Sequence, residues 1–230
     1  SGRTGAGKST IFKLLLGLYE PKTGSVQIQG KPAKDIPDTE KRHLFGYVEQ
    51  SFHMVPGTVK EQITLYDPSI TMEDVRAAAK MTGLDDTIMS LEHGYDTPCS
   101  DGIFSQGQWQ LLSIARAAAA KPKLLLLDEP TNHMDVQAKE TLESAFQAYQ
   151  GTILFVSHDR YFIRQVAQSV LIFEETGPMY YPFGYEHYLE KRQKAEEYGE
   201  ELSAQVKAED AALLEGMRTV PKAERHRLPE

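Results

Sequence analysis

Residues 2–9 follow the pattern G-x-x-x-x-G-K-S, and an apolar run typical of a helix comes directly after them. In such a glycine-rich loop the backbone N–H groups can turn inward around phosphates, and the next helix adds the positive end of its dipole. The Lys8 ammonium can neutralise terminal phosphates, and the Ser9 hydroxyl can bind Mg²⁺. A glycine turn before an ordinary helix would explain the glycines but not the Lys-Ser pair. The sequence therefore predicts a triphosphate site formed by Gly2, Arg3, Thr4, Gly5, Ala6, Gly7, Lys8, Ser9 and Thr10.

Two carboxylates follow a second apolar run. Residues 124–127 are all leucine, which predicts a buried strand, and Asp128 and Glu129 come at its C-terminal end. Open α/β sheets bind ligands at this edge. Asp128 would hold Mg²⁺ through water, and Glu129 would orient and polarise the attacking water. Acidic residues often end strands, so the pair is a weak signal alone. Together with Lys8, it predicts triphosphate hydrolysis.

The segments that must position these residues alternate between helical and strand patterns. Helices are expected over residues 8–18, 71–83, 105–120, 136–149 and 160–167, with Thr71 and Asp74 forming a capping box and Gly83 ending its helix. Strands are expected at 26–28 and 44–48, buried strands at 124–127 and 153–156, and a hairpin at 173–181. This order predicts an α/β fold with a central, mainly parallel sheet and a helical subdomain over about residues 63–120.

The composition sets limits on the kind of protein. Hydrophobic residues make up 40% of the 230 residues and charged residues 25%, which is ordinary for a globular protein that folds. The net charge of −8 argues against extensive polyanion binding. The apolar runs are too short to span a membrane, and no signal peptide is expected. The single cysteine, Cys99, excludes an internal disulfide and favours a cytoplasmic location, and no Cys or His cluster has zinc-site spacing.

The composition changes near Gly184, where the globular domain is expected to end. Residues 1–184 would form the nucleotide-binding domain and residues 185–230 a charged helical extension. Ala195, Tyr198, Leu202 and Val206 recur at helical spacing and give a narrow apolar stripe. The stripe could contact a partner, or the helix could simply be solvated.

Three further motifs carry a family resemblance: Phe104-Ser105-Gln106-Gly107-Gln108, Asp128-Glu129-Pro130 and Ser157-His158-Asp159. With the glycine-rich loop, they make residues 1–181 resemble an ATP-binding cassette (ABC) ATPase. The resemblance implies ATP and Mg²⁺ as ligands, Gln50 as the Q-loop ligand of magnesium and water, Asp135 as the D-loop aspartate and His158 as the switch histidine. Alternatively, His158 could be a buried, satisfied histidine. His133 could equally be structural, Trp109 is expected to pack, and Cys99 is expected to be a spectator.

The signature loop would comprise Ser105, Gln106, Gly107 and Gln108. In the family this loop reaches the γ-phosphate of ATP held by another cassette, so the resemblance implies a second cassette in a head-to-tail dimer. By themselves, Ser and Gly are also common helix caps. The position of the motif, 23 residues before Asp128, is what matches the signature loop of the family.

The chain resembles two classes within this family. Up to Lys123 it is similar to the nucleotide-binding domain of an ABC exporter, and from Leu124 it is similar to the ABC-F class of ribosome-associated ATPases. The favoured interpretation is an ABC-F-like cytoplasmic ATPase acting on the ribosome. The alternatives are an exporter cassette that drives transmembrane domains from the cytoplasmic face, and an ATP-gated binding module with little turnover.

The start of the chain also departs from the family. Family members have strands and an adenine-stacking aromatic residue before the phosphate loop, whereas this sequence begins at Ser1. An N-terminally truncated cassette is therefore expected, with weaker ATP binding than an intact one.

Overall fold

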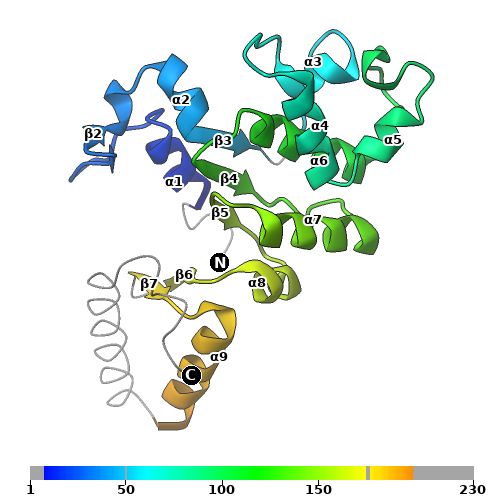
Figure 1. The fold of residues 1–230 in the computed structure, drawn as a ribbon. Helices are drawn as coiled ribbons and strands as arrows, with labels where there is room; N and C mark the ends of the chain where they lie inside the picture. The colour runs from blue at the N-terminus through cyan, green and yellow to red at the C-terminus, as the bar shows by residue number, and fades with distance from the viewer. Residues whose placement is uncertain (1–7, 50, 175–176, 199–230) are drawn as a thin grey trace. The chain divides into compact units, whose positions relative to one another are not determined.

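The computed structural model describes residues 8–49, 51–174 and 177–198, which belong to two compact units (Figure 1). The larger unit contains the described residues up to Phe162, and the smaller one begins at Ile163. All of the described residues proposed for nucleotide chemistry lie in the larger unit.

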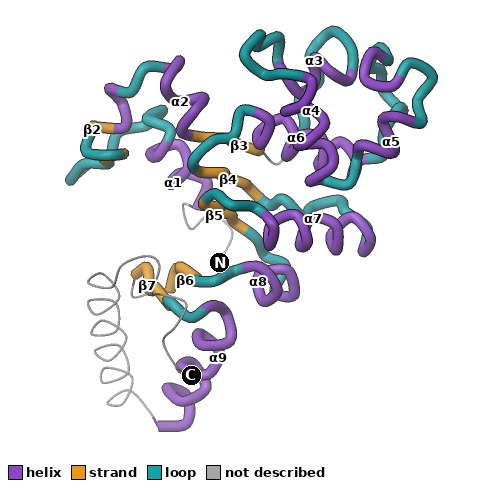
Figure 2. Tube along the Cα trace, viewed as in Figure 1, coloured by secondary structure: helices purple, strands orange, loops and turns teal. Residues whose placement is uncertain are grey.

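A parallel sheet forms the centre of the larger unit (Figure 2). Its strands are β3 (Phe45–Val48), β4 (Leu124–Asp128) and β5 (Thr152–Val156), in the order β3-β4-β5. The predictions of strands at 44–48 and 124–127 are confirmed. The register pairs Val48 with Leu127 and Asp128 with Val156, so the three strands end at the same edge.

The prediction that residues 153–156 form a buried strand is wrong in its burial. Leu154 in β5 is 38% exposed, whereas Leu126 in β4 is fully buried. The difference arises because β5 lies at the edge of the described sheet. Phe155 contacts Phe146 of α7 (Val136–Ala148) and Phe162 near the start of α8 (Arg160–Val166). On the opposite face of β5, Val156 packs against the core of the sheet, whereas Leu154 is exposed.

Helix α1 (Lys8–Leu15) packs on the sheet but is shorter than the sequence predicts. Phe12 joins Phe45 and Leu126 in a core cluster. The helix ends before Gly17, which adopts a left-handed φ of +70°. A Cβ on Gly17 would come within 2.4 Å of the Ala33 carbonyl oxygen, so glycine is required at this turn.

Between α1 and β3 the chain forms small elements that the sequence patterns only partly indicate. Strand β1 (Gln27–Ile28) pairs antiparallel with β2 (Lys31–Pro32), and a single 3-10 turn (Ala33–Asp35) follows. Helix α2 (Asp38–Leu44) was not predicted, because its seven residues contain none that is buried and so show no apolar periodicity.

A helical subdomain contains α3 (Val59–Thr64), α4 (Met72–Met81), α5 (Asp85–Met89) and α6 (Gln106–Ala119). Helices α3 and α4 both pack against α6. The capping box is confirmed: the Asp74 N–H donates to Thr71 Oγ1 (3.2 Å), and the Thr71 N–H donates to Asp74 Oδ2 (3.0 Å). Gly83 follows α4 with a left-handed φ of +70°, as expected of a helix-ending glycine.

Asp85 should make the stability of this subdomain sensitive to acid. Its carboxylate accepts hydrogen bonds from Arg76 Nε (3.1 Å), Arg76 Nη2 (2.9 Å) and the Tyr95 hydroxyl (2.8 Å), and the Arg76 bonds are the main cause of its lowered pKa. Because the folded pKa lies below 3.8, this stabilisation is complete at neutral pH and is lost as the pH falls below about 4. Asp85→Asn should therefore lower the urea midpoint at pH 7 and flatten its fall between pH 5 and 3. A fall as steep as in the unsubstituted chain would contradict this.

The smaller unit contains the predicted hairpin, in which β6 (Val170–Glu174) pairs antiparallel with β7 (Gly177–Tyr181). Helix α9 (Gly184–Tyr198) begins where the composition changes, and Tyr188 packs edge-on against Tyr181 with ring centroids 5.1 Å apart. Leu202 and Val206 of the predicted apolar stripe lie outside the described residues. Among the helices that the structure describes, none has the length and apolar character needed to cross a membrane.

Candidate functional site

Lys8 begins α1 and points toward the edge where the parallel strands end. The residue is only 8% exposed, and its Nζ lies 3.4 Å from Nε2 of His158. Ser9 and Thr10 are exposed in the same first helical turn. The remaining predicted residues of the phosphate loop, 2–7, lie outside the described part of the chain.

The backbone at the end of β4 aims Glu129 at His158. Glu129 adopts a left-handed φ of 50°, and its N–H donates to the Val156 carbonyl oxygen on β5 (2.9 Å). The His158 N–H donates to Glu129 Oε2 (3.1 Å), and His158 Nε2 lies 3.3 Å from Oε1. The Glu129 side chain is 13% exposed and that of His158 is 51% exposed. This exposure excludes the alternative of a buried histidine.

The side chains of Lys8 and Glu129 thus both lie next to His158, although Lys8 and His158 are 150 positions apart in the sequence. Asp128, at the last position of β4, is half-buried at the same strand edge. The pKa of Tyr47 is raised, mainly because the side chain is partly buried. The nearby negative charges of Glu49 and Asp128 raise it further. Asp128 therefore ends its strand at the edge where Lys8 and Glu129 both approach His158.

The donor types in this region fit MgATP. Mg²⁺ prefers oxygen ligands and commonly takes one or two carboxylates plus phosphate oxygens, which the Ser9 hydroxyl and the Asp128 carboxylate could complement. Among the residues that the structure describes, no group of three or more His, Cys, Asp or Glu side chains could hold a metal by itself.

The predicted signature residues form the start of α6. Ser105 is the N-cap and forms a capping box with Gln108. The Gln108 N–H donates to Ser105 Oγ (3.2 Å), and the Ser105 N–H donates to Gln108 Oε1 (2.9 Å). Gly107 is buried against His133 and Met134, whereas Gln106 is exposed. The capping role is therefore observed, and a role toward ATP of another cassette stays a prediction.

Asp135 has a local structural role as the N-cap of α7. Its Oδ1 accepts a hydrogen bond from the Ala138 N–H (2.8 Å). Two residues earlier, His133 is exposed and adopts a left-handed φ of 61°. Gln50, the predicted Q-loop residue, lies outside the described residues, although Glu49 and Ser51 on either side of it are described.

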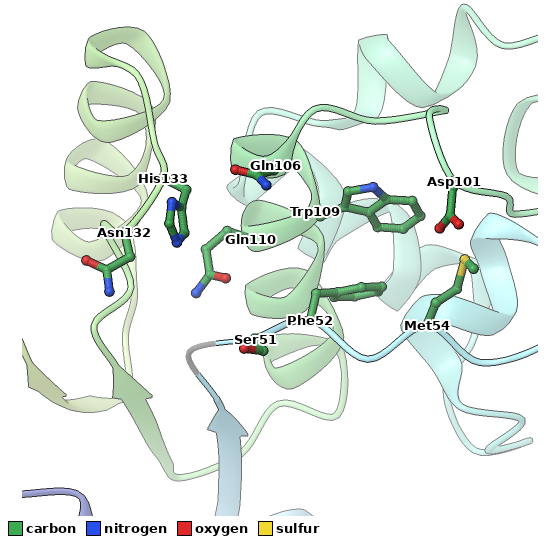
Figure 3. Close-up of a pocket in the computed structure, with 9 residues that line it drawn as sticks. All are labelled: Ser51, Phe52, Met54, Asp101, Gln106, Trp109, Gln110, Asn132 and His133. Carbon is green, nitrogen blue, oxygen red and sulfur yellow. The ribbon is translucent and has the colours of Figure 1, made fainter.

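A pocket of about 370 Å³ lies beside these loops (Figure 3). Phe52 stacks on Trp109 at one side, with ring centroids 4.8 Å apart, which confirms that Trp109 packs. Asn132 and His133 lie at the other side, and Gln110 lies between the two sides. The Gln110 Nε2 atom is buried without a hydrogen-bond partner in the described part of the chain. No sequence pattern indicates this pocket, because its walls come from three segments that are separate in the sequence.

Cys99 does not line this pocket, and its thiol is expected to be unreactive. Its thiol is partly buried, and this burial raises the pKa to about 11. Because only the thiolate is a good nucleophile, a thiol with this pKa remains protonated and unreactive at neutral pH. This agrees with the expected spectator role.

Comparisons with known proteins place the chain in a family. The family model described as ABC transporter matches residues 1–132. The uncharacterized ABC transporter ATP-binding protein YfiB of Bacillus subtilis is 38% identical over 176 residues, which cover 76% of this chain and 30% of YfiB. The ABC multidrug transporter mdr4 of Aspergillus fumigatus is also 38% identical, over 74% of this chain and 13% of its own length.

A similar solved structure is that of a bacterial Atm1-family ABC exporter with ATP bound. It aligns with a TM-score of 0.72 and 27% sequence identity, covering 91% of this chain and 36% of the exporter chain. The chain thus spans about a third or less of each of these proteins. The match over more than half of its residues, together with the parallel sheet and its lysine and carboxylate edge, shows that the chain belongs to the ABC transporter family.

Proposed function

We propose that this chain is the ATP-hydrolysing nucleotide-binding cassette of an ABC exporter. The observation that carries the proposal is the convergence of Lys8, Glu129 and His158 at the carboxyl edge of the sheet. Lys8 and the N-terminus of α1 would bind the phosphates, with Ser9, Asp128 and Gln50 as ligands of Mg²⁺. The metal, when bound, neutralises charge on the phosphate oxygens.

In this proposal Glu129 acts on the attacking water. The His158 N–H, which donates to Glu129 Oε2 at 3.1 Å, fixes one carboxylate oxygen. The other oxygen, Oε1, could then accept a proton from water placed in line with the γ-phosphate. His158 is half-exposed, so its ring can contact the γ-phosphate while its backbone orients Glu129.

The exporter assignment rests on the relatives and replaces the ribosome interpretation as the better-supported one. The Aspergillus relative is named a multidrug transporter, and the solved structure is that of an exporter. These relatives therefore support the exporter cassette better than the ABC-F interpretation. A cassette of this kind would work as a head-to-tail pair on the cytoplasmic face of a membrane, coupled to transmembrane domains.

Phosphate release from MgATP tests the activity directly. We expect release that depends on Mg²⁺ and stops when a chelator is added. Binding of MgATP without release would instead support a binding module with little turnover. For the exporter assignment, the full-length natural protein should fractionate with membranes. Sedimentation with purified ribosomes in the presence of ATP would favour the ABC-F interpretation.

Gly107→Asp should separate the proposed signature function from folding. A Cβ at Gly107 would lie 3.6 Å or more from its nearest neighbours, which is ordinary van der Waals contact, and an acidic residue suits the first turn of a helix. The carboxylate would, however, repel the γ-phosphate presented by a second cassette. We expect phosphate release to fall at least about 10-fold and ATP-dependent dimerisation to weaken, as measured by enzymatic assay and size-exclusion chromatography.

The matched control for that variant is Gly107→Asn, which has nearly the same shape and no charge. It should lose much less activity than Gly107→Asp, and thermal unfolding of both variants would show that each remains folded at the assay temperature. Equal activity in Gly107→Asp and the unsubstituted chain would remove Gly107 from the ATP site of the pair.

A further inference from the structure

Arg116 is the one charged residue of α6 and lies in the mostly apolar second half of this helix. The residues around it, including Ile114, Ala115 and Ala117, are buried. Its guanidinium donates hydrogen bonds from Nε to the Gln62 carbonyl oxygen (2.5 Å), from Nη1 to the His53 carbonyl oxygen (3.0 Å) and from Nη2 to Gln62 Oε1 (3.4 Å). These three bonds end on uncharged oxygen atoms, so the group acts as a geometric fork rather than as half of an ion pair.

Gln62 of α3 holds the same segment at a second point. Its side chain is fully buried, and it forms two hydrogen bonds with the backbone of one residue. The Val55 N–H donates to Gln62 Oε1 (2.9 Å), and Gln62 Nε2 donates to the Val55 carbonyl oxygen (2.7 Å). The backbone at His53 and Val55 is therefore fixed by side chains from two different helices.

An aromatic stack adds a third attachment. The Arg116 guanidinium lies 4.3 Å from the centroid of the Phe52 ring, within cation–π range. Phe52 in turn stacks on Trp109 (Figure 3), with ring centroids 4.8 Å apart. Trp109 also packs edge-on against Phe104, with ring centroids 5.0 Å apart. Trp109 is in the first turns of α6, directly after the signature residues.

Burial of Arg116 has an energetic cost that these contacts must offset. Removal from water lowers the pKa of its guanidinium to about 10, so the group stays charged at neutral pH. An apolar side chain at this position would avoid that cost but would leave the carbonyl oxygens of Gln62 and His53 without their donor. Its placement is therefore better explained by the segment that it holds.

We propose that Arg116 and Gln62 are positioning residues that fix residues 52–55, and with them the chain leaving Gln50, to the helix that begins with the signature. This proposal rests on the proposed function, in which Gln50 is a ligand of magnesium and water. Arg116 and Gln62 touch neither nucleotide nor metal in it. They hold residues 52–55 against α3 and α6, and in this proposal they would act on the Gln50 amide only through the chain that connects it to Phe52.

The test compares ATP binding with and without Mg²⁺ in the Glu129→Gln background, where turnover does not interfere. Arg116→Lys keeps the charge but loses the fork. It should leave Mg²⁺-free ATP affinity within about 2-fold and reduce the gain in affinity from Mg²⁺ about 10-fold, a loss typical of residues that orient metal ligands. Arg42→Lys is the matched control, because Arg42 is exposed and pairs with Asp67. It should change neither value.

A double-mutant cycle shows whether the effect passes through Gln50. Gln50→Ala should reduce the Mg²⁺-dependent gain by itself, and Arg116→Lys added to it should reduce the gain no further. Additive losses, or equal losses with and without Mg²⁺, would mean that Arg116 only supports the fold and would overturn the proposal. Phe52→Leu should reproduce part of the Arg116→Lys effect, and Phe52→Tyr should restore it.

Tryptophan fluorescence shows independently whether each substitution disturbs the aromatic stack. Trp109 is the only tryptophan in the chain, so its emission reports on the Phe52 stack directly. Arg116→Lys and Phe52→Leu should shift this emission before any ligand is added, whereas Arg42→Lys should not. An unchanged emission in both stack variants would also overturn the proposal. If the unsubstituted chain binds MgATP but releases no phosphate, the proposed hydrolysis fails while these binding measurements still decide the role of Arg116.

Discussion

Replacing Glu129 with Gln should lower phosphate release about 1,000-fold and leave MgATP binding almost unchanged. A general base contributes roughly 10² to 10⁴ in rate, and the amide cannot accept the proton of the attacking water. The substitution preserves the shape of the side chain and the hydrogen bond that its oxygen accepts from the His158 N–H, so the local backbone should stay in place. The loss should therefore appear in kcat rather than in nucleotide affinity.

Single-turnover phosphate release and equilibrium binding of ATP would measure the two effects separately. Glu140→Gln is a suitable control, because Glu140 is an exposed glutamate on α7 and should retain full activity. The variant without Glu129 should also accumulate as an ATP-bound dimer, because hydrolysis would no longer separate the pair. Unchanged turnover in Glu129→Gln would remove Glu129 from the mechanism.

Replacing Lys8 with Ala should weaken ATP binding about 10- to 100-fold and abolish detectable turnover at ordinary ATP concentrations. A hydrogen bond to a charged group contributes about 1.5 to 3 kcal/mol, and each 1.4 kcal/mol corresponds to a factor of ten in affinity. The Lys8 side chain is held near His158 at the strand edge, where phosphates would bind. Its loss should act on binding, unlike the loss of Glu129.

Lys13→Ala provides the control for that variant, because Lys13 is on the same helix and its Nζ lies over the Tyr19 ring at 5.3 Å, at the end of α1 opposite to Lys8. ATP affinity should be preserved in Lys13→Ala. Isothermal titration calorimetry would compare the two lysines, and thermal unfolding would show that Lys8→Ala remains folded. Equal affinity in Lys8→Ala and the unsubstituted chain would place the nucleotide elsewhere.

The features predicted correctly from sequence are those with local causes. The capping box at Thr71 needs only a residue three positions later, and the positions of β3 and β4 follow from short apolar runs. By contrast, the end of α1 depends on the Ala33 carbonyl oxygen lying against Gly17, and the exposure of β5 depends on its place at the sheet edge. Neither neighbour can be deduced from the spacing of nearby residues.

The residue types of the candidate site were determined by the sequence alone: a lysine after a glycine-rich loop, two carboxylates after a run of leucines, and a histidine after the next strand. Only the tertiary structure decided how these residues meet. The parallel register pairs Asp128 with Val156, which brings Glu129 beside His158, and the packing of α1 brings Lys8 to the same edge. The contacts of Arg116 with residues 52–62 were likewise visible only in the fold. The residue type determines which reaction a side chain could support. Whether it can do so depends on its distance from residues in other segments, and that distance is set by tertiary packing.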